Sequence, residues 1–159
     1  MMDDFSTPGQ ANTYGLAPSA ANFIAPGKRP LSSMSPSIFV RESDGAMVVV
    51  GASGGPRIIT ATLQALVRLL LRGRSPFDAI HLPRLHDQLL PDECRAEEST
   101  LHDGTLLRVS RARREALARR GHHVVNTSSV GVAQLVVRRE NGELHAVSDR
   151  RKGGRPADF

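Results

Sequence analysis

Two short segments carry the residues best suited to chemistry. Ser32 and Ser33 lie in the run Pro-Leu-Ser-Ser-Met-Ser-Pro at positions 30–36. Gly54 and Gly55 end a Gly-Ala-Ser-Gly-Gly run that leads directly into an apolar segment with helical spacing. Serine hydroxyls are neutral donors for a carboxylate, and the amides at a glycine-rich helix entrance can face a developing negative charge. Together the two segments could bind a carboxylate-bearing substrate and stabilise an oxyanion.

Each segment alone has a simpler interpretation. A Ser-Ser pair is most often a polar turn or a helix cap, and a glycine run is often a plain strand-to-helix turn. No Lys-Ser or Lys-Thr pair follows Gly55, so the run is not a P-loop. It also lacks the spacing of a dinucleotide fingerprint. Pro56 suits the first turn of a helix in either interpretation.

The elements that must position these segments are predicted from hydrophobic patterns. Two β-patterned runs, at 37–41 and 47–50, flank Ser43-Asp44-Gly45 and predict a hairpin. The continuous valines of the second run predict a strand buried on both faces. Apolar residues at helical spacing from position 57 to 71 predict a helix that Gly73 ends, and a short helical turn is expected at 76–80.

The rest of the chain alternates between loop, helix and strand patterns. We expect a loop over 6–30, rich in Pro, Gly, Ser, Ala and Asn, and a loop with a short strand over 82–91. A second helix is predicted over 104–120, followed by strands at 123–126, 131–139 and 144–147, the last two joined at Asn141-Gly142. The expected fold class is α+β, a layered domain of antiparallel strand pairs with helices between and beside them.

The 159-residue chain has a formal charge of +5 and a sequence pI near 10.6. Much of the positive charge falls in the predicted helix at Arg108–Arg120, which is typical of a solvated helix face. A non-catalytic module that binds nucleic acid or an acidic protein through this helix is the alternative hypothesis. One tyrosine and no tryptophan leave few stacking platforms for single-stranded nucleic acid.

Other residues that could do chemistry are given structural roles. Cys94 is the single cysteine, which excludes an internal disulfide and offers no zinc site. His86 is expected to be a structural, hydrogen-bonding histidine. The carboxylates at 93, 97 and 98 are interpreted as an acidic surface run. His122 and His123 are adjacent and would point to opposite faces of a strand, so no metal site is predicted.

Targeting and membrane segments are not expected either. The start of the chain has no basic region followed by an apolar core, so we predict no signal peptide. The apolar stretch at 58–71 contains Gln64 and Arg68 and is too short to span a membrane. These residues indicate no compartment.

The order Asp3-Asp4-Phe5, then Ser32-Ser33, then Gly54-Gly55 resembles the small subunit of the γ-glutamyltransferases, also called glutathione hydrolases. The segments at 83–91 and 148–159 resemble that family too, so the resemblance runs from Asp3 to Phe159. It implies that residues 1–159 are a single partial domain, the C-terminal part of the small subunit. The implied fold is a partial αββα N-terminal-nucleophile hydrolase sandwich that lacks the nucleophile strand.

The resemblance implies a role for each site residue. Asp4 would accept from the substrate's α-ammonium, and Ser32 and Ser33 would donate to its α-carboxylate. The N–H groups of Gly54 and Gly55 would form the oxyanion hole. Tyr14, in the lid-like loop 6–30, would close over the bound glutamyl group, although a surface tyrosine in a loose loop is an equal alternative.

The resemblance also implies reaction and partners. The intact enzyme would transfer the γ-glutamyl group of glutathione, or of another γ-glutamyl compound, to water, an amino acid or a dipeptide, with no cofactor. Its partners would be the large subunit and the N-terminal part of the small subunit.

Two departures from the family pattern matter. Met1 stands where the family has an acidic or amide residue, and no threonine matches the family's nucleophile. We therefore expect the isolated chain to be inactive and poorly folded, with unpaired strand edges that favour association.

Overall fold

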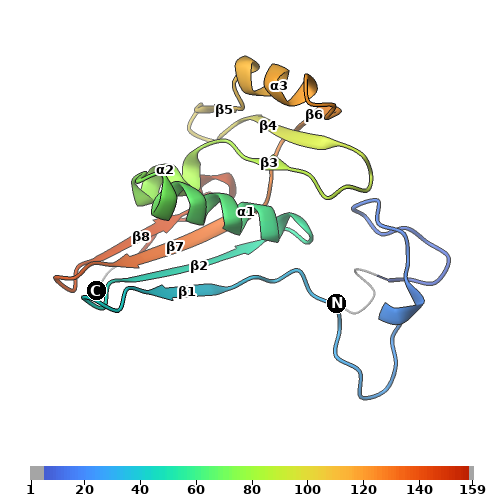
Figure 1. The fold of residues 1–159 in the computed structure, drawn as a ribbon, viewed down its shortest axis with the longest axis horizontal. Helices are drawn as coiled ribbons and strands as arrows, with labels where there is room; N and C mark the ends of the chain where they lie inside the picture. Colours follow the sequence, from blue (N-terminus) through green and yellow to red (C-terminus); the bar gives the residue numbers. More distant parts are fainter. Residues whose placement is uncertain (1–5, 158–159) are drawn as a thin grey trace.

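The computed structural model describes residues 6–157, so Asp4 lies outside the described residues. Within this range the chain forms layers in the order sheet, helices, smaller sheet, helix (Figure 1). This mixed arrangement confirms the predicted α+β class.

The larger sheet consists of two hairpins side by side. Its strands are, in order, β1 (Ser37–Val40), β2 (Met47–Ser53), β7 (Val132–Arg138) and β8 (Leu144–Ser148). All neighbours are antiparallel, with Ile38 opposite Val49 in the first hairpin and Val136 opposite Ala146 in the second. Both predicted hairpins are confirmed.

Two helices cover one face of this sheet. Helix α1 (Arg57–Leu66) continues into the π-helical turn η3 (Val67–Leu71), and α2 (Pro76–His81) follows. Ser75 caps α2, because its Oγ accepts from the backbone N–H of Asp78 at 3.0 Å. Buried aliphatic side chains between helices and sheet form the core: Val48, Val50, Ala65, Ala79, Ile80, Ala133 and Leu135.

The prediction that the valine run is buried on both faces is wrong. Val48 and Val50 are 8% and 2% exposed, but Val49 between them is 37% exposed. Alternate residues of a strand point to opposite faces, and among the described residues helices cover only the face of Val48 and Val50.

The smaller sheet was only partly predicted. Its strands are β3 (Leu85–His86), β4 (Cys94–Thr100), β5 (Leu106–Arg108) and β6 (Val124–Thr127). Strand β4 pairs antiparallel with β3 and β5 and parallel with β6, so the expectation of antiparallel pairs holds for all neighbours except β4 and β6.

The helix predicted over 104–120 is wrong in its first half. Leu106, Leu107 and Arg108 form β5, with Leu107 5% exposed and its neighbours exposed, which is the period of a strand. Helix α3 is confined to Arg111–Ala118 and lies outside the smaller sheet (Figure 1).

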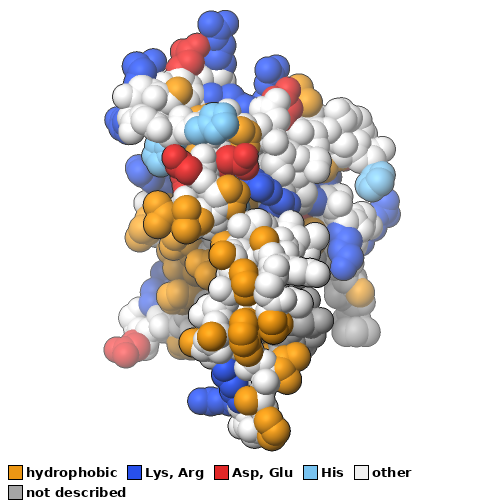
Figure 2. Space-filling view, turned by 90° about the vertical axis from the view of Figure 1, so that its right-hand side faces the viewer, with side chains coloured by type: hydrophobic (Ala, Val, Ile, Leu, Met, Phe, Trp, Pro, Cys, Tyr) orange, Lys and Arg blue, Asp and Glu red, His pale blue; other side chains and the backbone are white. Residues whose placement is uncertain are grey.

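The predicted loop over 6–30 is confirmed, apart from one short 3₁₀ turn, η2 (Ala20–Asn22). Two hydrogen bonds connect Ser6 to Ser19 within this loop. The Oγ of Ser6 donates to the carbonyl of Ser19 at 2.7 Å and accepts from the N–H of Ser19 at 2.9 Å. Figure 2 shows the side of the molecule that carries this loop, with hydrophobic side chains in patches over its middle and lower part. No helix among residues 6–157 is long and apolar enough to cross a membrane.

Candidate active site

The glycine corner joins the end of β2 to the start of α1. Gly54 has φ +134° and Gly55 has φ +60°, backbone conformations that favour glycine. Their carbonyls accept from the N–H groups of Arg57 and Ile58, at 3.3 and 3.0 Å, and so begin the helix. Outside regular helices and strands, no hydrogen bond within residues 6–157 is donated by the N–H of Gly54 or Gly55. Both amides therefore stand available at the N-terminus of a ten-residue helix.

Tyr14 lies directly against this corner. A Cβ atom added to Gly55 would stand 2.3 Å from Cζ of Tyr14 and 2.4 Å from its hydroxyl oxygen. Only a residue without a side chain leaves room for the ring at that distance. The structure thus brings the tyrosine of the lid-like loop onto the glycine corner.

The serine pair also reaches this corner. Ser33 Oγ donates to the carbonyl of Gly55 at 2.6 Å, whereas Ser32 Oγ accepts from the N–H of Met34 at 3.1 Å. The hydroxyl proton of Ser32 is therefore left to donate elsewhere, while that of Ser33 points at the Gly55 carbonyl. Four of the predicted site residues thus meet at the corner: Tyr14, Ser33, Gly54 and Gly55. Ser32 is the chain neighbour of Ser33, and Asp4 lies outside the described residues.

A chain of side-chain contacts connects Tyr14 to α1. Thr60 Oγ1 lies 2.8 Å from His86 Nδ1, and His86 Nε2 lies 2.8 Å from Gln88 Oε1. Gln88 Nε2 donates to the carbonyl of Tyr14 at 3.3 Å. Burial, the largest cause, lowers the pKa of His86 below 6.5, and the charges of Arg57 and Arg95 act in the same direction. The predicted structural role of His86 is confirmed.

A loop from the far end of the sequence backs the glycine corner. A Cβ atom on Gly54 would stand 2.9 Å from Cα of Gly131, and Arg57 Nη1 donates to the carbonyl of Ser129 at 2.9 Å. Gly131 itself has φ +69°, and a Cβ there would stand 3.1 Å from the carbonyl oxygen of Ser53. The residues at 129–131 therefore form the wall behind the two amides.

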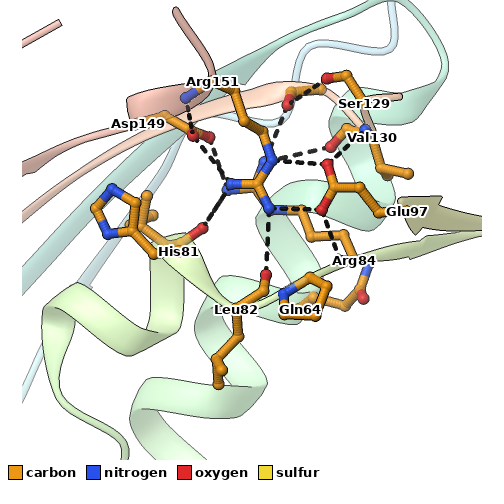
Figure 3. Close-up of polar contacts among 12 residues, drawn as sticks. Gln64, His81, Leu82, Arg84, Glu97, Ser129, Val130, Asp149 and Arg151 are labelled. Atoms are coloured by element: carbon orange, nitrogen blue, oxygen red, sulfur yellow. Dashed lines mark hydrogen bonds and ion pairs between the residues drawn. The ribbon is translucent and has the colours of Figure 1, made fainter. Parts of the chain in front are cut away.

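Four buried charged residues lie behind that wall (Figure 3), and we call them the charge cluster: Arg84, Glu97, Asp149 and Arg151. Arg151 binds both carboxylate oxygens of Glu97, at 2.7 and 2.6 Å. Arg84 Nη2 donates to Asp149 Oδ2 at 2.8 Å, and Arg151 Nη1 donates to Asp149 Oδ1 at 2.9 Å. Two cations thus balance two anions in a site closed to water, which is the condition for burying charge.

The charge cluster holds the wall from both sides. Glu97 Oε1 accepts from the N–H of Val130 at 3.1 Å, and Arg84 Nη1 donates to the carbonyl of Gly131 at 3.0 Å. Burial acts to raise the pKa of Asp149, but the charges of Arg84 and Arg151 outweigh it and leave that pKa below 3.8. The Asp149 carboxylate therefore stays ionised at neutral pH, as its pairing with Arg84 and Arg151 requires.

One sequence-based interpretation of charge is wrong. Glu97 is not on the surface, because its side chain is fully buried. The solvated basic face predicted for the helix is confirmed, because most of its arginines are exposed. Two of them are paired: Arg114 lies 3.2 Å from Glu98 and also bonds Asn126, and Arg111 lies 2.6 Å from Glu115. The alternation of the strand gave no signal for Glu97, because burial of Cys94 and Ala96 on one face would turn Glu97 to the other face.

This fold and glycine corner define an α+β protein of the N-terminal-nucleophile hydrolase class, and solved structures agree. The T380A mutant of Helicobacter pylori γ-glutamyltranspeptidase superimposes with a TM-score of 0.78 at 36% identity, covering 94% of this chain and 78% of that one. The sequence profile of the family Gamma-glutamyltranspeptidase matches residues 1–159. The chain belongs to the γ-glutamyltranspeptidase family.

Curated relatives agree with this assignment. The glutathione hydrolase proenzyme of Arthroderma benhamiae is 38% identical over 150 residues, which cover 94% of this chain and 24% of that protein. Scoloptoxin SSD20 of Scolopendra dehaani is 42% identical over 154 residues, which cover 96% of this chain and 74% of that protein. The chain thus spans about a quarter of the proenzyme's length.

Proposed function

We propose that this chain forms the substrate-binding and oxyanion-stabilising part of a γ-glutamyltransferase that acts on glutathione or other γ-glutamyl compounds. The observation that carries the proposal is the glycine corner: two amides available at a helix N-terminus, with Tyr14 against Gly55 and Ser33 bonded to it. Such amides stabilise negative charge that develops on a carbonyl oxygen.

The substrate would be held by its charged amino-acid end. Asp4 would bind the α-ammonium, and the hydroxyls of Ser32 and Ser33 would bind the α-carboxylate. The Ser32 proton is already free to donate, whereas the Ser33 hydroxyl would turn from the Gly55 carbonyl to the substrate. Holding this end places the γ-carbonyl at the corner, and such positioning is worth several kcal/mol.

The reaction would pass through an acyl-enzyme, as the family resemblance implies. A threonine hydroxyl, outside the described site, attacks the γ-carbonyl carbon while its own α-amine takes the proton. The carbonyl π electrons move to the oxygen, and the N–H groups of Gly54 and Gly55 donate hydrogen bonds to the oxyanion that forms. When the C–N bond breaks, the leaving amine takes up that proton, and water or an acceptor amine then attacks the ester. Loss of one oxyanion-hole N–H donor costs about 3 kcal/mol of transition-state stabilisation.

A row of exposed apolar side chains on the outer face of the larger sheet is an argument that a partner binds there. Ile38, Val49 and Val136 stand side by side on neighbouring strands and are 67%, 37% and 37% exposed. They point away from α1, on the face that a second sheet covers in a sandwich. The remainder of the small subunit and the large subunit are the proposed occupants.

A chimera tests the proposed function. This chain would replace the matching segment of the Helicobacter pylori γ-glutamyltranspeptidase, which supplies the threonine and the large subunit. Hydrolysis of a chromogenic γ-glutamyl anilide is then measured. We expect turnover by the chimera and none by this chain alone. In the chimera, Ser32→Ala with Ser33→Ala should raise KM at least tenfold, because the carboxylate loses both donors.

The matched control is Ser37→Ala, which removes a hydroxyl that donates only to the backbone of Ser35. It should leave both kinetic constants unchanged. A chimera that turns over normally with the Ser32/Ser33 double variant would refute the proposed clamp. Hydrolysis by the isolated chain that disappears with Gly54→Ala would refute its proposed dependence on a partner.

A further inference from the structure

Three side chains from three neighbouring segments converge at one end of the smaller sheet. The carboxylate of Asp87, the thiol of Cys94 and the imidazole of His122 each bring one atom within 4.8 Å of the other two. These are the oxygen, sulfur and nitrogen donors that bind divalent transition metals. We propose that Asp87, Cys94 and His122 form a binding site for Zn²⁺ or a divalent ion of the same class.

The backbone places these residues together independently of their side chains. Cys94 is the first residue of β4, and its N–H donates to the carbonyl of His123 at 2.8 Å, which fixes the segment before β6. On the other side of β4, Leu85 pairs with Ala96 and His86 with Arg95. Continued by one residue, that register sets Asp87 opposite Cys94. The proposed ligands therefore come from three adjacent strand ends.

The donor atoms already lie near the separation that two ligands of one zinc ion have. Asp87 Oδ2 lies 3.1 Å from His122 Nδ1, while Asp87 Oδ1 accepts from the N–H of Leu89 at 3.0 Å. The Leu89 amide thus orients the carboxylate with one oxygen turned to the imidazole, as outer hydrogen bonds orient metal ligands. The ligands of a tetrahedral zinc ion lie about 3.3–3.8 Å apart, as bond lengths of about 2.0–2.3 Å require. Small side-chain rotations would suffice.

The charges and the solvent exposure of the three side chains also suit a divalent cation. A thiolate and a carboxylate balance a divalent cation, and the neutral imidazole completes three ligands. Arg95, the nearest cation along β4, is paired with Glu93 at 3.3 Å. Cys94 is 4% exposed, whereas the side chains of Asp87 and His122 are 36% and 41% exposed. An ion could enter from solvent and would keep a fourth position for water. A thiolate among the donors favours Zn²⁺ over Mg²⁺ or Ca²⁺.

A bound ion would brace the turn that holds the lid. Asp87 lies between His86 and Gln88, the two residues that connect Thr60 of α1 to the carbonyl of Tyr14. Zinc at Asp87 would fix this turn to β4 and to the start of β6. The site would therefore act on the position of Tyr14 without touching the glycine corner.

Cobalt titration of the full 159-residue chain, kept reduced with a phosphine and first shown to be folded by circular dichroism, tests the site. Cys94 is the single cysteine, so a thiolate-to-cobalt absorption band reports this thiol alone. We expect a saturable band at one ion per chain that Zn²⁺ abolishes by displacement. Zn²⁺ should also raise the melting temperature, because it binds only the folded site.

Variants separate a three-ligand site from a lone thiol. Asp87→Asn and His122→Asn, both at exposed positions, should each weaken cobalt binding at least tenfold and remove the zinc-dependent rise in melting temperature. Asp92→Asn and His123→Asn are exposed neighbours outside the cluster and should change neither. Absence of a band at millimolar cobalt would overturn the proposal. So would Asp87 and His122 variants that bind cobalt as tightly as the unaltered chain. Cys94→Ser should abolish the band, and the exposed variants decide the outcome if it fails to fold.

Discussion

The Cα atom of Gly131 lies so close behind Gly54 that a methyl group on Gly54 would stand 2.9 Å from it. Gly131 is held in turn by Arg84, whose guanidinium donates to the Gly131 carbonyl at 3.0 Å. The glycine corner is therefore not a free loop, because a buried ion-pair system fixes its far wall. Each contact along this path can be altered singly.

Replacing Gly54 with alanine should destabilise the chain. The residue would have to adopt φ +134° and would collide with the Gly131 backbone, which cannot move without disturbing Arg84. The backbone strain alone costs about 1–3 kcal/mol. The measurement is urea-induced unfolding followed by circular dichroism. Gly51→Ala is the control: a Cβ there meets nothing within 4 Å, so its unfolding midpoint should be unchanged or slightly higher. Equal midpoints for the two variants would contradict the close contact.

Replacing Gly55 with alanine should displace Tyr14. The new methyl group would overlap the Tyr14 ring, 2.3 Å from its Cζ atom, so the ring must leave the corner. Tyr14 is the single tyrosine in a chain without tryptophan, so tyrosine fluorescence reports this ring alone. Acrylamide should quench the variant more strongly than the parent.

Gly142→Ala is the matched control for this displacement. Gly142 also has a positive φ, +84°, but a Cβ there meets nothing within 4 Å. This variant carries a similar backbone cost in the β7–β8 turn and should leave acrylamide quenching unchanged. Unaltered quenching in Gly55→Ala would show that Tyr14 does not rest on the corner in solution.

The features predicted from the sequence are those with local causes. Asp44-Gly45 and Asn141-Gly142 each set a turn between two β-patterned runs, and both hairpins formed. Likewise, the glycines at 54–55 and the apolar periodicity after them predicted a strand-to-helix corner. In these cases a few adjacent residues determine the backbone, so no distant contact is needed.

The features that the sequence did not predict depend on contacts between residues far apart in the chain. Glu97 looks like a surface carboxylate until Arg151, 54 residues later, is placed against it. Strand β4 was missed for the same reason, because charged residues concealed a buried strand. The proposed metal ligands also come from separate segments, and a lone cysteine reveals nothing of the aspartate and histidine beside it.

Neutralising Glu97 should be among the most damaging conservative changes. Glu97→Gln removes the charge that Arg151 and Arg84 require and weakens the hold on Val130. Breaking a buried pair by removing one partner costs about 3–5 kcal/mol. For comparison, Glu115→Gln breaks an exposed pair with Arg111 and should cost less than about 1 kcal/mol. Urea unfolding of both variants gives the comparison, and losses of similar size would mean that the charge cluster is unimportant for stability.

Stability should fall as the pH falls below 6.5, through the buried histidines. Burial is the largest cause of the lowered pKa of both His86 and His81, so the unfolded chain binds their protons more readily than the folded chain. The stabilisation is complete above 6.5, the value without burial, and is lost as the pH drops through the lower folded values. Each histidine can contribute a slope of at most about 1.4 kcal/mol per pH unit. Urea unfolding between pH 8 and pH 5 measures it. His86→Gln should reduce the slope, since glutamine does not titrate, whereas the exposed His123→Gln should preserve it. A His86 variant with the full slope would place the acid sensitivity elsewhere in the chain.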